Sequence, residues 1–293
     1  MTQWRQLLAN KKVLIVDGAW GTELAKRGLG PGECPEKWNM DRPDDVRAVA
    51  SEYAQAGADI VLTNTFGGNP FKLAEAGLEK NTESVNHRGT ELSKDAAGKQ
   101  ALVFASIGPT GQFMKPLGSV GEKEMVKAFA RQVRGFVAGG ADGVVIETMT
   151  DTGEAIAAIK AVKDHSDLPV AASMTFDKGA KGYATMMGVE PNRAAEALTR
   201  AGADIVGSNC GAGPDNMIEI IALMKPETSL PLWAKPNAGI PELIEGKTCF
   251  RLGPKAFADD FHKLVAAGAK LIGGCCGTTP EHIQALAEKR ESL

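Results

Sequence analysis

Three cysteines stand directly after apolar segments of the chain, in an arrangement that could bind one metal ion. Cys275 and Cys276 follow the run Lys270–Ile272 after two glycines, and Cys210 follows the run Ile205–Gly207. Thiolates are soft ligands that suit Zn²⁺, whereas Mg²⁺ and Ca²⁺ prefer oxygen. The sequence therefore predicts a zinc site with three sulfur ligands and one exchangeable position.

The exchangeable position has a candidate oxygen ligand. Asn237 follows the apolar run Leu232–Lys235, which lies in the sequence between the two cysteine-bearing segments. Cys34 and Cys249 have no such placement and are interpreted as small buried residues. Two other interpretations of the adjacent cysteines stay open. They could form a strained disulfide, or their glycine-rich loop could bind phosphate at the start of a helix, although that loop contains no basic residue.

Eight short apolar runs recur along the chain and must position these groups. They are Val13–Val16, Asp59–Leu62, Ala101–Ser106, Gly143–Ile146, Val170–Met174, Ile205–Gly207, Leu232–Lys235 and Lys270–Ile272. Continuous apolar runs are typical of parallel strands that are buried on both faces. Eight such units predict an α/β protein, a single (β/α)8 TIM barrel over residues 1–293, with the active site at the C-terminal face of the strands.

A doubly wound open sheet is the alternative fold. It would usually carry a Gly-x-Gly-x-x-Gly loop after its first strand, and the segment Asp17–Thr22 has a different spacing. The segments between the apolar runs show helical periodicity, for example over 46–54, 217–224 and 257–265. Four of them end in a glycine that suits a left-handed helix stop: Gly57, Gly140, Gly202 and Gly268.

In the predicted barrel, the polar groups gather at the carboxyl ends of the strands. Cys210 would lie on strand six and the adjacent cysteines on strand eight, and alternate strands contribute to the same layer of a TIM barrel. Strand spacings of ~4.8 Å and Zn–S bonds of ~2.3 Å would let the three sulfurs meet at one ion. The other strand ends include Asp17, Thr63, Glu147 and Asn209.

Composition limits the classes of partner. The formal net charge is −3, which argues against nucleic acid or an anionic membrane as a partner. No apolar run reaches the roughly 18 residues of a membrane span. Five cysteines, two of them adjacent, make a poor disulfide framework, so we expect a cytoplasmic protein.

At these residues the chain resembles the homocysteine S-methyltransferase family. Within that family the sequence motifs are most similar to those of the homocysteine-binding module of cobalamin-dependent methionine synthase. The matching segments are Asp17–Thr22, Ala58–Ile60, Thr63–Phe66, Gly108–Gly111, Glu147–Thr148, Asn209–Cys210, Pro236–Gly239 and Gly273–Pro280. Two places depart from the family pattern: Trp20, which would reshape the pocket near strand one, and the loop Gly182–Gly188, which we expect to face the methyl donor.

The resemblance implies a set of site residues. The catalytic zinc ligands would be Cys210, Cys275 and Cys276, with Asn237 in the fourth position until the homocysteine thiolate replaces it. Glu147 would bind the substrate ammonium and Asp17 would assist. The implied substrate-binding residues are Asp17, Gly18, Thr63, Glu147 and Asn209.

The implied reaction is methyl transfer to homocysteine to give methionine. A free thiol has a pKa of ~8.5, so few molecules are thiolates at neutral pH, and zinc would bind the thiol as its anion. We expect methylcobalamin on a separate corrinoid protein as the donor. The alternative donors are betaine, S-methylmethionine, and another methylated compound used by a corrinoid-linked demethylase component. A phosphate-handling barrel lyase and a non-catalytic zinc module are less favoured interpretations.

Overall fold

Eight parallel strands form the central sheet of the computed structural model, which describes residues 2–244 and 247–293. The strands are β1 (Leu14–Ile15), β2 (Ile60–Val61), β3 (Leu102–Ile107), β4 (Gly143–Met149), β5 (Val170–Met174), β8 (Ile205–Cys210), β9 (Leu232–Pro236) and β12 (Ala269–Ile272). Their order in the sheet is β1-β12-β9-β8-β5-β4-β3-β2. Each of the eight apolar runs predicted from the sequence therefore overlaps a strand, and the strands follow the chain around the sheet.

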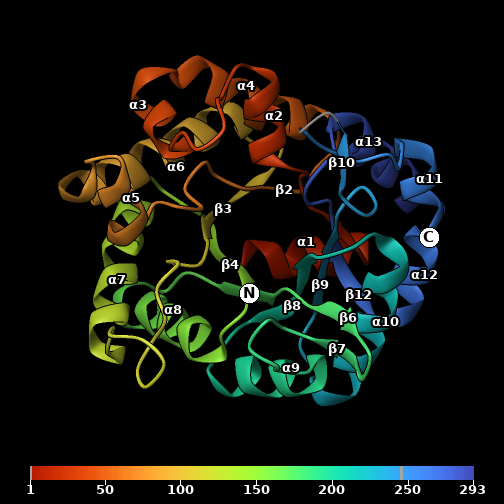
Figure 1. The fold of residues 1–293 in the computed structure, drawn as a ribbon. Helices are drawn as coiled ribbons and strands as arrows, with labels where there is room; N and C mark the ends of the chain where they lie inside the picture. The colour runs from red at the N-terminus through yellow and green to blue at the C-terminus, as the bar shows by residue number, and fades with distance from the viewer. Residues whose placement is uncertain (1, 245–246) are drawn as a thin grey trace.

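The sheet closes between β1 and β2. A parallel bridge joins Val16 to Ile60. The backbone N–H of Asp17 donates to the Ile60 carbonyl at 3.0 Å, and that of Asp59 donates to the Ile15 carbonyl at 2.7 Å. These contacts give a near-closed TIM barrel inside a ring of helices (Figure 1). The alternative of a doubly wound open sheet is wrong, because such a sheet would leave both edge strands unpaired.

Helices cover the outside of the barrel. The main ones are α2 (Trp20–Lys26), α4 (Pro43–Gln55), α6 (Thr82–Ala97), α7 (Glu122–Ala138), α8 (Thr152–His165), α9 (Pro191–Arg200), α10 (Pro214–Met224), α11 (Pro254–Asp259), α12 (Phe261–Ala267) and α13 (Pro280–Arg290). Shorter helices are α3 (Trp38–Asp41) and α5 (Pro70–Glu75). The predicted helix over 257–265 is in fact two helices, because the chain leaves helical geometry at Asp260, which has φ −87° and ψ 0°.

Local sequence explains where many of these helices begin and end. Proline stands in the first turn of several of them, where its missing N–H costs no hydrogen bond. The four glycines expected to stop helices have positive φ values: 94° at Gly57, 77° at Gly140, 93° at Gly202 and 117° at Gly268. This left-handed geometry is accessible to glycine without a steric penalty, so the chain turns directly into the next strand.

Alternating side chains on the strands build two separate cores. Residues that point outward, such as Ile15, Val61 and Val144, pack against the helices. Their neighbours Leu14 and Val145 point into the barrel. The inner core is completed by Val16, Ile60, Leu62, Phe104, Ala171, Ile205, Trp233 and Leu271. A period of two along each strand therefore fills the barrel with side chains rather than leaving a pore.

Helix α1 (Gln3–Lys11) lies across the amino-terminal end of the barrel, where Figure 1 shows it behind the strands. Its Trp4 is 2% exposed and packs against the inner core, with Leu7 and Leu8 partly buried beside it. This end is closed, so the cavity described below opens at the other end. Two small hairpins, β6 (Asp177–Gly179) with β7 (Gly182–Ala184) and β10 (Glu242–Ile244) with β11 (Lys247–Cys249), belong to loops on that open side.

In the part of the chain that the structure describes, none of the helices is both long enough and apolar enough to cross a membrane.

Candidate metal centre and substrate cavity

The three predicted cysteines meet at the open end of the barrel. Cys210 is the last residue of β8, and Cys275 and Cys276 lie in the loop after β12. Their three Sγ atoms lie within 4.8 Å of one another, and the sulfurs of Cys210 and Cys276 are 4.0 Å apart. All five cysteines are free thiols, so the alternative of a disulfide between the adjacent pair is wrong. Among the described residues, these three form the one group with metal-ligand geometry.

The loop that carries the adjacent cysteines is tied to the loop after β1 by buried hydrogen bonds. The Thr278 hydroxyl donates to the Cys275 carbonyl at 2.7 Å and accepts from the Ala19 N–H at 3.2 Å. The Tyr53 hydroxyl from α4 lies 2.8 Å from the Ala19 carbonyl and 3.3 Å from the Thr278 carbonyl. These contacts fix the backbone on which both cysteines depend.

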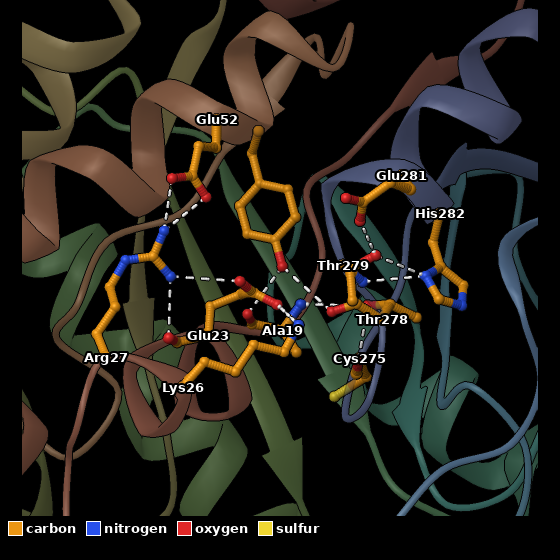
Figure 2. Close-up of polar contacts among 11 residues, drawn as sticks. Ala19, Glu23, Lys26, Arg27, Glu52, Cys275, Thr278, Thr279, Glu281 and His282 are labelled. Carbon is orange, nitrogen blue, oxygen red and sulfur yellow. Dashed lines mark hydrogen bonds and ion pairs between the residues drawn. The ribbon is translucent and has the colours of Figure 1, made fainter.

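A capped helix start holds the other side of the same loop. The Thr279 N–H donates to Nδ1 of His282 at 3.2 Å, which closes a capping box at the start of α13 (Figure 2). Because Nδ1 accepts this bond, Nε2 carries the proton and donates to the Leu252 carbonyl at 2.8 Å. Burial lowers the pKa of His282, which favours this neutral form.

Contacts among the three sulfurs shift the pKa values of the three thiols in opposite directions. Hydrogen bonds from Cys275 and Cys276 lower the pKa of Cys210. Conversely, the contact with Cys210 raises the pKa values of both Cys275 and Cys276. One thiolate therefore forms easily while its two partners keep their protons. A cation that binds thiolates would displace those protons, as is usual for cysteine metal sites.

Asn237, the predicted fourth ligand, has a buried side-chain oxygen that is left without a partner. Its side chain is 3% exposed, and its Nδ2 donates to the Gly211 carbonyl at 2.6 Å. Its Oδ1 is buried and has no hydrogen-bond partner in the described structure. An unpaired buried acceptor costs roughly 1–3 kcal/mol, and a cation held by the cysteines would satisfy it. Three sulfurs and one amide oxygen fit tetrahedral Zn²⁺.

A cavity of about 450 Å³ opens beside the three thiols. Its inner wall includes Gly18, Thr63, Ser106, Glu147, Thr148, Lys235 and the three cysteines. Its outer wall includes Trp20, Glu33, Cys34, Glu36, Phe66, Lys72 and Glu75. The volume suits an amino-acid-sized molecule beside the thiols with a second small group next to it.

Glu147 is the acidic group on the inner wall. It lies near the end of β4 and is 8% exposed, and one carboxylate oxygen accepts a 2.6 Å hydrogen bond from the Ser106 hydroxyl. Burial raises the pKa of Glu147 to about 7, although the Lys235 ammonium and the Ser106 hydroxyl oppose that rise. The cavity therefore contains a carboxyl group suited to receive a substrate ammonium.

Asp17 makes its contacts within the protein. Its side chain is fully buried, and Oδ1 accepts from the Lys235 ammonium at 2.7 Å. Its Oδ2 accepts from the Trp20 indole N–H at 2.8 Å and from the Leu62 N–H at 2.7 Å. The two side chains of the Asp17–Lys235 pair are 0% and 2% exposed. Trp20, noted above as a departure, thus lines the cavity and orients Asp17.

The other predicted substrate-binding residues have different surroundings. Gly18 lines the cavity, and a Cβ there would lie 2.7 Å from the Tyr53 hydroxyl, so only glycine fits. Thr63 also lines it, while its hydroxyl accepts from the Ser106 N–H at 3.1 Å. Asn209 is 0% exposed and hydrogen-bonded to protein groups on all sides.

The comparison with protein families identifies the family to which this chain belongs. The family model described as Homocysteine S-methyltransferase matches residues 14–290. The chain belongs to the homocysteine S-methyltransferase family. It is an enzyme of that family with a candidate three-cysteine zinc site. The phosphate-handling lyase and the non-catalytic zinc module are therefore set aside.

Two curated relatives of this family member are methionine synthases. That of Mycobacterium leprae (strain TN) is 31% identical over 295 residues, which cover 94% of this chain and 24% of the relative. That of Mycobacterium tuberculosis (strain ATCC 25618 / H37Rv) is 30% identical over 296 residues, which cover 95% of this chain and 24% of the relative. The chain thus spans about a quarter of the length of these relatives.

A solved structure is similar over nearly its whole length. The metallated form of the homocysteine methyltransferase MmuM from Escherichia coli has a TM-score of 0.81 and 25% sequence identity, and the match covers 97% of this chain and 99% of that one. Its apo form has a TM-score of 0.76 at the same identity. The overall fold is therefore shared with a relative of similar length.

Sequence reasoning missed several polar groups in and behind the cavity wall. Lys235 ends the apolar run Leu232–Lys235, and a charged residue in a buried strand was a signal that could have been followed. Ser106 and Ser173 carry no such signal, because serine is common at strand ends. Their roles depend on which strands become neighbours, which only the closed barrel reveals.

Proposed function

We propose that this enzyme transfers a methyl group to the sulfur of homocysteine and so forms methionine. The proposal rests on one observation above all: three convergent thiols and the buried carboxyl of Glu147 line the same cavity. An amino acid with a terminal thiol has complementary groups, a sulfur for the metal and an ammonium for the carboxylate. Family membership supports the same acceptor.

Zinc bound by the three cysteines would hold the substrate sulfur as a thiolate at neutral pH and keep it nucleophilic, because the three anionic ligands offset the metal charge. The remaining steps belong to the protein. Asn237 would help to hold the ion through its buried amide oxygen in the absence of substrate. Glu147 would hold the ammonium, with Gly18 and Thr63 lining the amino-acid end. Asp17 would assist through the charge pair with Lys235 rather than by direct contact, since its oxygens are already used.

In the transfer itself, the sulfur–carbon bond forms as the bond between the methyl carbon and the donor breaks. The electron pair of the broken bond stays with the donor, and the thiol proton has already left to solvent. The enclosing cavity wall aligns the two reactants, and such alignment accounts for a large share of many catalysed displacements.

We propose methylcobalamin on a separate corrinoid protein as the donor. The similarity to two methionine synthases supports this. So do apolar side chains on loops at the open end of the barrel, among them Phe113, Leu117, Met186 and Ile240, which are 52–71% exposed. Exposed apolar groups around a cavity mouth are typical of protein docking surfaces. Met186 belongs to the loop Gly182–Gly188, which we expect to face the donor.

A small onium compound is the second candidate donor, and a different observation favours it. Three carboxylates, those of Glu33, Glu36 and Glu75, line the outer cavity together with the aromatic rings of Trp20 and Phe66. Acidic and aromatic groups suit a sulfonium or quaternary ammonium ion.

One assay tests the acceptor and the donors together. Zinc-loaded protein and homocysteine would be incubated with methylcobalamin, with a betaine and with S-methylmethionine in parallel, and methionine would be measured. We expect methionine with methylcobalamin and none with Cys210→Ser. Activity with an onium donor alone would replace the corrinoid assignment, and the absence of methionine with every donor would refute the acceptor.

A further inference from the structure

Asn209 connects the cysteine triad to the end of β4, where Glu147 lies, through a hydrogen-bond network that uses both polar atoms of its side chain. Its Oδ1 accepts from the Thr148 N–H at 2.8 Å and from the Ser173 hydroxyl at 2.6 Å. Its Nδ2 donates to the Thr148 hydroxyl at 2.7 Å and lies 3.8 Å from the Cys275 sulfur. The side chain is fully buried and is absent from the cavity wall, so it has no free group for a substrate.

The network stabilises an irregular strand end next to the carboxylate of Glu147. The pairing of β4 with β5 shifts between Ile146 and Met149, so two residues of β4, Glu147 and Thr148, stand opposite the single residue Ser173. This is a β-bulge, a feature that redirects side chains next to active sites. Thr148 has a φ of 61°, and a non-glycine residue in that region costs roughly 1–3 kcal/mol. Because of the bulge, the N–H and hydroxyl of Thr148 are paired with the Asn209 side-chain amide. The Ser173 hydroxyl donates to the oxygen of the same amide.

The same residue also borders the thiols. Asn209 directly precedes Cys210, whose φ of 64° is again left-handed. Among the described residues other than glycine, positive φ values occur only at Lys12, Thr148 and Cys210. Two of these three, Thr148 and Cys210, thus lie beside the Asn209 amide; Thr148 directly follows Glu147, and Cys210 is itself one of the three cysteines.

We propose that Asn209 is a positioning residue that fixes the separation between the thiol triad and Glu147, and thereby selects an amino-acid thiol with two methylene groups over one with a single methylene. This inference rests on the proposed function. A substrate held at both ends must match the distance between its two binding groups. Cysteine is one methylene shorter than homocysteine, so its sulfur and its ammonium cannot both reach a site set for the longer chain.

The test compares the binding of homocysteine and cysteine to zinc-loaded protein by calorimetry, with zinc affinity measured by chelator competition. We expect the unsubstituted protein to prefer homocysteine by about 10- to 200-fold, the usual value of one methylene. Asn209→Ser should reduce that preference at least about tenfold and weaken zinc binding by about 10- to 100-fold, as is common when a contact that orients a metal ligand is lost.

Ser208→Ala is the matched control. Ser208 is the neighbouring residue on β8, equally buried, and its hydroxyl has no hydrogen-bond partner in the described structure. This variant should keep the preference. If Asn209→Ser does not fold, Thr148→Val removes one arm of the network with little change in shape, and it should also reduce the preference.

A double variant separates positioning from a general structural role. If Asn209 acts through Glu147, Asn209→Ser should change homocysteine affinity little once Glu147→Gln has removed the carboxylate. Additive losses in the double variant, or an unchanged preference in Asn209→Ser, would overturn the inference alone. An unsubstituted protein that binds no homocysteine would overturn the proposed function and this inference together.

Discussion

Glu147 meets two opposing requirements at the residue scale. A carboxylate that binds an ammonium ion must be charged, and the burial that makes the contact strong also disfavours the charged form. In this cavity burial raises the pKa of Glu147 to about 7, while the Lys235 ammonium opposes that rise. The group therefore changes charge within the physiological range.

A pH dependence follows from this shift. Below the raised pKa, Glu147 is mostly protonated and holds the ammonium weakly; above it, the anion holds the ammonium firmly. We expect kcat/KM for homocysteine to rise with pH through about 7. Glu147→Gln should remove the part of the rise centred near 7, leaving the part that comes from loss of the substrate thiol proton. It should also weaken homocysteine binding by about 10- to 150-fold, since a hydrogen bond to a charged group contributes roughly 1.5–3 kcal/mol.

Glu154→Gln provides the control for the pH prediction. Glu154 is also buried with a raised pKa, but it accepts from the Thr110 N–H and hydroxyl and does not line the cavity. Its variant should retain the rise in kcat/KM. A rise that persists unchanged in Glu147→Gln would show that another group titrates.

At the scale of the elements, the spacing of β8 and β9 decides where Cys210 and Asn237 lie. Gly207 on β8 allows that spacing, because a Cβ there would lie only 2.0 Å from the Trp233 carbonyl oxygen of β9. Gly207→Ala should separate the strands. We expect a loss of at least about 3 kcal/mol in the free energy of unfolding and a clear loss of zinc affinity, measured by urea unfolding and chelator competition.

Gly121→Ala is the matched substitution, because a Cβ at Gly121 would meet nothing within 4 Å and the residue has no positive φ. It should change neither quantity appreciably. If Gly207→Ala bound zinc as tightly as the unsubstituted protein, the strand spacing would not be what places the ligands.

The elements also show what the sequence could and could not predict. The eight strands were predictable because parallel strands buried on both faces consist of continuous apolar residues. The helix ends were predictable where a glycine, such as Gly57 or Gly268, allows the left-handed conformation that stops a helix. The convergence of Cys210 with Cys275 followed from strand order alone. The Asp17–Lys235 pair and the bulge at Thr148 were not predictable, because the pair joins residues far apart in the sequence and the bulge depends on the register between β4 and β5. No local pattern encodes either feature.

At the scale of the whole molecule, the end of the barrel that is closed by packed side chains is opposite the end that carries the candidate active site. Trp4 on α1 closes the amino-terminal end, whereas the thiols lie at the opposite end. Trp4→Ala should lower the free energy of unfolding by about 3–5 kcal/mol, the usual loss for a buried large aromatic residue. Zinc stoichiometry and homocysteine affinity should remain unchanged in the folded variant.

The neighbouring substitution Arg5→Ala controls for a general effect of altering α1. The Arg5 side chain is 51% exposed, forms a 3.3 Å ion pair with Asp204 and lies 5.0 Å from the centroid of the Trp4 ring. Exposed contacts of these kinds contribute at most about 1 kcal/mol each. Both variants are compared by urea unfolding and by calorimetry. A loss of homocysteine binding in folded Trp4→Ala would contradict the separation between the two ends.

The central claim is that Cys210, Cys275 and Cys276 hold one zinc ion with an exchangeable fourth position. X-ray absorption at the zinc edge, before and after addition of homocysteine, tests it most directly. The account predicts three sulfurs with one lighter ligand in the free protein, and four sulfurs once homocysteine is bound. A protein that takes up no zinc, or a zinc ion whose sulfur coordination does not change with homocysteine, would contradict it.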